Sequence, residues 1–240
     1  MIALGTIVNT TAVLVGGGIG LVAKKGISER LQTALTKAIG VAVMIVGLSG
    51  VLSEMLTVNN GKLSANGTIM LIISLVIGTF VGELIDIEKR LESVGNKVKK
   101  LATRGNNSDD RFVEGFVTNT LVICVGAMAI VGSLNDGLYG DPTMLYAKSI
   151  LDGVIAIVFA STMGVGVLFA AIPLFLYQGG ITVLSGLISG WLSDAMISNL
   201  SCVGSALILV IGLNMAVGAK IRTGNMLPSL IVPIIWTLFQ

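Results

Sequence analysis

Three short segments of this chain share one pattern: Gly50-Val51-Leu52-Ser53-Glu54, Gly132-Ser133-Leu134-Asn135-Asp136 and Gly190-Trp191-Leu192-Ser193-Asp194. The shared form is Gly-x-Leu, then Ser or Asn, then an acid, and each copy closes a long apolar stretch. This recurrence indicates an internally repeated membrane protein. Many transport folds are built from internal repeats, with a binding site where the repeats meet.

The composition is typical of an integral membrane protein. Of the 240 residues, 54% are hydrophobic and only 12% are charged, whereas about 25% are charged in a soluble domain. The net charge of +2 gives no clustered basic surface for nucleic acid. The chain has no histidine, so imidazole is removed from any catalytic or metal-ligand scheme. We therefore expect one membrane domain (1–240) in a lipid bilayer, with no enzyme activity, metal, cofactor or nucleic-acid partner.

Apolar stretches set the predicted architecture, because a transmembrane helix needs about 20 mostly apolar residues. We predict an all-α polytopic protein with seven full spans, at 2–23, 39–56, 67–85, 113–134, 150–175, 178–193 and 200–219. A last apolar stretch, 226–239, is short and starts at Met226-Leu227-Pro228, where proline suits the first turn of a helix. It is either a re-entrant half-helix or a tilted short span.

Basic residues predict the orientation. They gather between spans one and two, between spans three and four, and after span seven, whereas the segments 57–66 and 135–149 hold one lysine each, Lys62 and Lys148. The positive-inside rule then places the N-terminus outside. Amphipathic stretches at 27–32 and 87–101 fit interfacial helices along the inner leaflet, and 105–110 reads as a polar loop.

The repeat extends beyond the acidic motif. Gly5-Thr6-Ile7 with Gly16 and Gly20 matches Gly67-Thr68-Ile69 with Gly78 and Gly82 at an offset of 62 residues. We predict two-helix repeats at about 2–56, 67–136 and 150–194, with 200–239 as a truncated fourth copy. Each glycine pair lies on one helix face, which favours close helix packing over a backbone that lines a narrow path.

Polar residues within the apolar stretches are the candidate site. Asn9, Asn119 and Asn214 lie inside spans, where an amide needs a partner. They either join helices by hydrogen bonds or line a polar cavity. Glu54, Asp136 and Asp194 at the outer span ends are either solvated helix termini or an acidic vestibule that concentrates cations.

Three further charged residues lie near span ends. Glu114, at the start of span four, pairs with Arg111 or takes part in binding. Asp152, at the outer start of span five, is either an acid that stabilises a helix N-terminus or a residue that gates the path or binds a ligand. Arg222, with the backbone N–H groups that begin 226–239, would suit an anion if this stretch is a half-helix.

A family resemblance rests on several motifs. The stretches Glu114-Gly115-Phe116, 124–132, Asp136-Gly137, 148–153, 159–162 and Tyr177-Gln178-Gly179 resemble the uncharacterised bacterial YdfK/YqgA-type membrane family, as do Gly5-Thr6-Ile7-Val8-Asn9, Gly212-Leu213-Asn214, Ile221-Arg222 and 225–228. The resemblance covers almost the whole chain and implies a bacterial inner-membrane protein. It transfers no substrate. It directs attention to the polar residues of these stretches: Asn9, Glu114, Asp136, Asp152, Gln178, Asn214, Arg222 and Asn225.

Repeats, buried amides and acids at span ends predict a channel or transporter for a small ion or solute. The alternative is a membrane scaffold or assembly partner without flux, which glycine packing and an amphipathic helix fit equally well. An intramembrane enzyme has no readable nucleophile and base to support it. A homo-oligomer is compatible with so small a chain.

Overall fold

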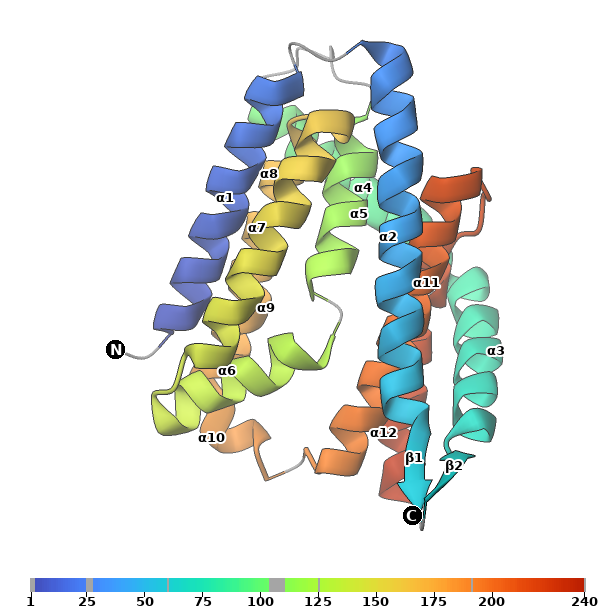
Figure 1. Cartoon of the computed structure of the whole chain (residues 1–240). Helices are drawn as coiled ribbons and strands as arrows, with labels where there is room; N and C mark the ends of the chain where they lie inside the picture. Colours follow the sequence, from blue (N-terminus) through green and yellow to red (C-terminus); the bar gives the residue numbers. More distant parts are fainter. Residues whose placement is uncertain are drawn as a thin grey trace. The chain divides into compact units, whose positions relative to one another are not determined.

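The computed structural model describes residues 3–24, 28–59, 61–103, 111–124, 126–190 and 192–239 (Figure 1). The chain is almost entirely helical. Its α-helices are α1 (Leu4–Lys24), α2 (Glu29–Met55), α3 (Thr68–Ile85), α4 (Ile87–Thr103), α5 (Phe112–Cys124), α6 (Ala127–Tyr139), α7 (Thr143–Met163), α8 (Gly166–Phe169), α9 (Ala171–Val183), α10 (Ser185–Ile188), α11 (Asp194–Val217) and α12 (Ile231–Leu238). A 3-10 segment, η1 (Thr223–Leu230), precedes α12.

One element was not predicted. Strands β1 (Leu56–Asn59) and β2 (Lys62–Ala65) form an antiparallel hairpin in the connection between the second and third spans. The predicted helix at 87–101 is confirmed as α4. The stretch 27–32 is not a separate helix, because residues from Glu29 onward belong to α2. Ile27, the loop 105–110 and Trp191 lie outside the described residues.

The multi-pass helical class is confirmed. Six of the described helices are long and apolar enough to cross a membrane, or seven if α5 and α6 form one span bent by 61°. The predicted spans 150–175 and 178–193 are wrong in their boundaries. The backbone N–H and hydroxyl of Thr143 donate to Asp141 where α7 begins, and Gly164, with a φ of 88°, ends it. The next span therefore starts at Gly166.

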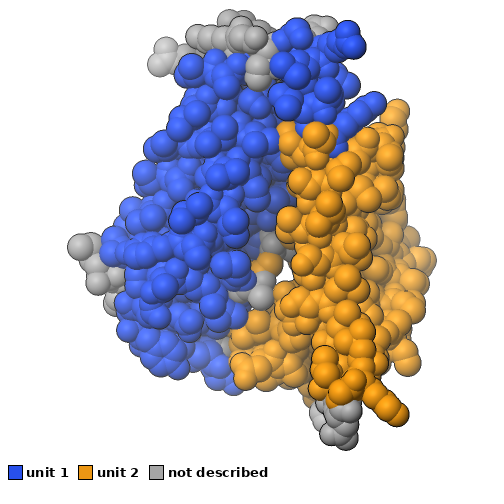
Figure 2. All heavy atoms as spheres, viewed as in Figure 1, with its two compact units in different colours: residues 1–37, 91–124, 128–191 blue, residues 38–90, 125–127, 192–240 orange. Residues whose placement is uncertain are grey.

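The described chain groups into two compact units (Figure 2). Unit 1 comprises residues 1–37, 91–124 and 128–191, which include α1 and α5 to α10. Unit 2 comprises 38–90, 125–127 and 192–240, which include α3, α11, η1 and α12. The single domain and its two-helix repeats stay predictions.

In unit 1, α1 and α7 run in the same direction in close contact. Gly16 lies against the backbone of Gly153, and Gly20 lies against the carbonyl of Ile157. A methyl group at either glycine would overlap a carbonyl oxygen of α7. The packing role predicted for this glycine pair is therefore confirmed, since small residues let helix backbones approach.

In unit 2, the second glycine pair has the same role. Gly82 lies against Asn225, and Gly78 against Ser229, so η1 runs antiparallel to α3. A 3-10 helix rises about 2.0 Å per residue and an α-helix about 1.5 Å, so the eight residues of η1 and the eight of α12 extend about 28 Å. The 18 residues of α3 extend about 27 Å. Thr223–Leu238 is a shorter apolar helix and is not among the six described helices long enough to cross a membrane, so both alternatives for 226–239 stay predictions.

Candidate functional site

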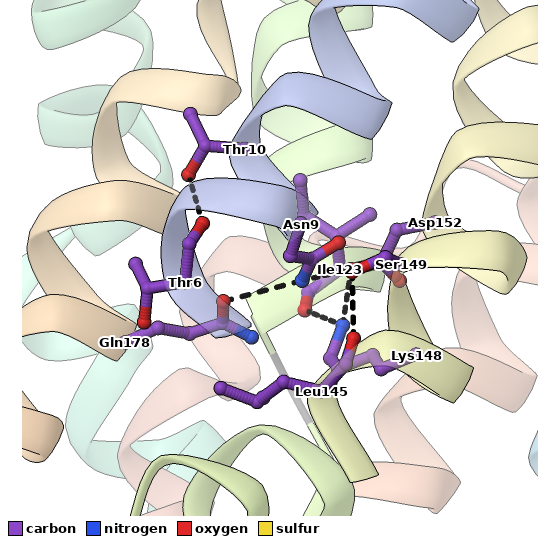
Figure 3. A network of polar contacts seen from close by, with 9 residues as sticks. All are labelled: Thr6, Asn9, Thr10, Ile123, Leu145, Lys148, Ser149, Asp152 and Gln178. Atoms are coloured by element: carbon purple, nitrogen blue, oxygen red, sulfur yellow. Dashed lines mark hydrogen bonds and ion pairs between the residues drawn. The ribbon is translucent and has the colours of Figure 1, made fainter. Parts of the chain in front are cut away.

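A lysine and an aspartate on α7 form a buried ion pair. Lys148 and Asp152 lie four residues apart on one helix face, with side chains 8% and 5% exposed, and the lysine Nζ donates to Asp152 Oδ2 (Figure 3). Nζ also donates to the carbonyl of Ile123 at 2.7 Å. Lys148 was predicted to lie in an outer connection. That placement is wrong, because α7 begins at Thr143 rather than at residue 150.

Two amides connect this ion pair to α1 and α9. Asn9 Nδ2 donates to Asp152 Oδ2 at 2.9 Å and to Gln178 Oε1 at 3.2 Å (Figure 3). Asn9 and Gln178 are completely buried. We call Asn9, Lys148, Asp152 and Gln178 the polar network. Three of its members were predicted, and only Lys148 was missed. Its i, i+4 spacing from Asp152 was the signal that could have revealed it.

The network lies midway along α7. Asp152 is nine residues after Thr143, or about 14 Å into the helix at 1.5 Å per residue, and about 17 Å before Met163. The prediction that Asp152 opens a span from outside is therefore wrong. Charged side chains at such a position inside a span are expensive and are by default functional.

Several buried polar atoms near the network have no hydrogen-bond partner among the described residues. Within the network these atoms are Asn9 Oδ1 and Gln178 Nε2. Others on α1, α6 and α9 are Thr6 Oγ1, Ser133 Oγ, Asp136 Oδ1 and Thr182 Oγ1. Buried polar groups are normally paired with protein or water. A bound solute, ion or water would satisfy these atoms.

Apart from Asn119 Oδ1 on α5, the unpaired buried polar atoms of unit 1 lie in one half of the unit. Gly5 lies beside Asp136 and Leu145, and Gly137 lies beside Thr182, so these atoms occupy the unit between the N-terminal end of α1 and the network. Beyond the network, towards the C-terminal end of α7, the largest buried side chains are apolar. They include Phe112, Phe159, Met163 and Val167. Among the described residues there, Asn119 and Thr162 are polar and fully buried.

The helix that faces Lys148 is interrupted. α5 ends at Cys124 and α6 runs at 61° to it. The carbonyls in the last turn of α5 therefore lack a backbone N–H from a following helical turn that would donate to them. The Ile123 carbonyl receives Lys148 instead, and a cation is favourable at a helix C-terminus. Asn119 braces the same helix by donating to the carbonyl of Val167 at 3.1 Å.

The acids of the repeated motif lie in three different settings. Glu54 in the last turn of α2 accepts from Ser198 Oγ at 2.6 Å. Asp136 is completely buried and accepts from the backbone N–H of Gly5 at 3.0 Å, which caps the start of α1. Asp194 is the first residue of α11 and is exposed. The prediction that each acid lies at the end of a span is wrong for Asp194, which begins a helix. The interpretation of these acids as solvated helix termini is wrong for Asp136, which is buried.

The remaining predicted residues are not part of the network. Glu114 is exposed in the first turn of α5. Asn214 is not deep, since it lies in the last turn of α11 and bonds the backbone of Ile221 through both its oxygen and its nitrogen. In the same unit, Arg222 pairs with Glu83 at 3.3 Å, and Asn225 Oδ1 accepts from the N–H of Glu88 at 2.7 Å. These three residues belong to unit 2 and brace the turn that leads into η1.

Comparisons with known proteins agree on the family. The profile of the family described as "Protein of unknown function (DUF554)" matches residues 4–238. The chain is 34% identical over 229 residues to "Uncharacterized membrane protein YdfK" of Bacillus subtilis, which covers 95% of this chain and 93% of that protein. It is 29% identical over 231 residues to "Uncharacterized protein YqgA" of Escherichia coli, with 95% and 94% covered. No solved structure matches the chain.

Proposed function

This chain belongs to the family of proteins of unknown function DUF554, and we propose that it is a channel or transporter that moves a small ion or solute through unit 1. The observation that carries the proposal is the polar network midway along α7. A buried ion pair is weak evidence for a stabilising role, because apolar side chains of similar volume often stabilise a fold as well. An ion pair in the middle of an apolar helix, next to amide atoms without partners, supports a role in binding.

The interrupted helix supports the same function. Transporters commonly bind their ions and substrates near the middle of discontinuous spans, where free backbone groups face the site. Here the Ile123 carbonyl, in the last turn of α5, holds the Lys148 ammonium. A ligand that competes for this carbonyl or for the Asp152 carboxylate would release the lysine.

The two halves of unit 1 suggest the direction of access. Most of the unpaired buried polar atoms lie between the N-terminal end of α1 and the network, and mostly apolar side chains fill the other half. We propose that the polar half is the access route and that the apolar half is the closed gate. Because every network residue is at most 6% exposed, the site is occluded in this conformation.

We propose a bacterial inner membrane as the location, with the N-terminus outside. The excess of basic residues in alternate connections supports this orientation, and Lys148 no longer counts as an outer lysine because it is buried in α7. With this orientation the polar half of unit 1 opens to the outside. The site requires no catalytic step, so we propose no enzyme activity.

The test is flux into proteoliposomes, with purified protein and a panel of monovalent cations, anions, protons and amino acids. Selective flux should be lost in Asp152→Asn and strongly reduced in Asn9→Ala. Glu92→Gln, which neutralises an exposed acid of α4 in unit 1, is the matched control and should transport normally. Equal flux in Asp152→Asn and the control would refute the role of the network. Silence across the panel, with folded and inserted protein, would favour the scaffold.

A further inference from the structure

Unit 2 contains a cavity of about 300 Å³ that uses no residue of the polar network. It lies where α2 ends, where the hairpin returns to α3, and where α11 begins. Trp236 of α12 closes one wall. This is the end of the unit that carries the hairpin and the C-terminal end of the chain (Figure 1).

A carboxylate and two amides supply its polar lining. Glu54 is held by Ser198 Oγ, which donates to its Oε2 at 2.6 Å. Asn66 Nδ2 donates to Thr57 Oγ1 at 2.9 Å, and Asn199 Nδ2 donates to Thr237 Oγ1 at 3.0 Å. Each amide nitrogen is therefore already bound to a threonine. Each amide nitrogen keeps a second N–H, and the lining residues also supply three acceptors, the second Glu54 oxygen and the two amide oxygens.

The other walls are aromatic and thioether groups. Trp236, Met55 and Met70 line the same cavity. An indole face attracts cations, and methionine adapts to irregular apolar ligands. A calcium ion would require six to eight oxygen ligands, which three acceptors and an apolar wall do not supply. The lining fits an organic cation with a short alkyl chain.

We propose that this cavity binds a small organic amine through its primary ammonium group. The three N–H bonds of the ammonium match the three acceptor oxygens of Glu54, Asn66 and Asn199, and the alkyl chain packs on Trp236. Binding here does not depend on transport through unit 1.

The test is isothermal titration calorimetry on the full-length protein in nanodiscs. The probe is n-butylammonium chloride, with sodium chloride at equal ionic strength as the blank. The chain has two tryptophans, so a Trp191→Phe background makes Trp236 the only fluorescent reporter and locates the bound amine. We expect saturable binding, which Glu54→Gln weakens about tenfold or more because a charge-assisted hydrogen bond is lost. Glu83→Gln, an exposed acid of α3 paired with Arg222, should bind like the parent.

Tetramethylammonium tests the three hydrogen bonds, since it carries the charge without an N–H. It should bind at least several-fold more weakly than butylammonium. No saturable binding, equal affinity for the two cations, or equal affinity of the Glu54→Gln and Glu83→Gln variants would each overturn the proposal. Because this readout measures binding rather than flux, its failure is distinct from failure of the transport proposal.

Discussion

Removing one member of the Lys148–Asp152 pair should cost far more stability than removing both. In Lys148→Met, Asp152 keeps only the Asn9 amide at 2.9 Å. In Asp152→Leu, the lysine keeps only the Ile123 carbonyl at 2.7 Å. An uncompensated buried charge costs about 3–5 kcal/mol, so each single variant should lose about that much free energy of unfolding.

The double variant Lys148→Met/Asp152→Leu leaves no buried charge. Asn9 still donates to Gln178, so the remaining cost comes mainly from the carbonyl of Ile123, which loses its partner, and we expect about 1–3 kcal/mol. If the two sites acted independently, the costs would instead add to about 6–10 kcal/mol. The measured interaction energy should therefore reach at least about 3 kcal/mol.

The assay is reversible unfolding in bicelles with increasing sodium dodecyl sulfate, followed by circular dichroism for the parent, both single variants and the double variant. Additive costs in the cycle would refute the coupling, and with it the geometry of the polar network. Flux should be absent in the double variant even though its stability is largely recovered. A stable double variant that still transports would show that the ion pair is outside the path.

Three further outcomes follow from local geometry. Gly16→Ala should destabilise the protein by about 1–3 kcal/mol, since its methyl would overlap the α7 backbone, whereas Gly18→Ala, with open space around it, should be neutral in the same unfolding assay. Asn9→Ala should cost about 1–4 kcal/mol, from two contacts at about 0.6–2 kcal/mol each; no loss there would contradict the observed bonds. The Thr143 hydroxyl, and then its backbone N–H, lower the pKa of exposed Asp141. The ionised Asp141 carboxylate therefore adds a small stabilisation to the folded state. This stabilisation is present at pH values above the pKa that Asp141 has in the unfolded chain, and it is lost as the pH falls through the lowered pKa of the folded state. Carboxyl NMR titration of Thr143→Val should show that pKa moving up.

Much of the architecture follows from local sequence. The spans α1 and α3 and the amphipathic α4 lie close to where their apolar patterns predict, because burial in lipid demands long helices and leaves few alternatives. The span α2 ends close to where predicted but begins at Glu29 rather than at residue 39. The roles of Gly16 with Gly20 and of Gly78 with Gly82 were also readable, since paired small residues on one helix face indicate close contact. Asn9 was recognisable as a polar residue inside an apolar stretch and Asp152 as an acid near a span end, whereas Gln178 was singled out only through the family resemblance.

Tertiary structure decided which of these residues meet. Asn9, Lys148 and Gln178 are far apart in sequence, and only the packing of α1, α7 and α9 brings them to one carboxylate. Hydropathy alone assigned Lys148 to a connection, because a lysine lowers the local average whether or not an acid lies one turn away. The three acids of the repeated motif look equivalent in sequence, yet Asp136 caps a buried helix while Glu54 lines a cavity. Their environments depend on which helix ends pack against them, and a one-dimensional pattern does not contain that information.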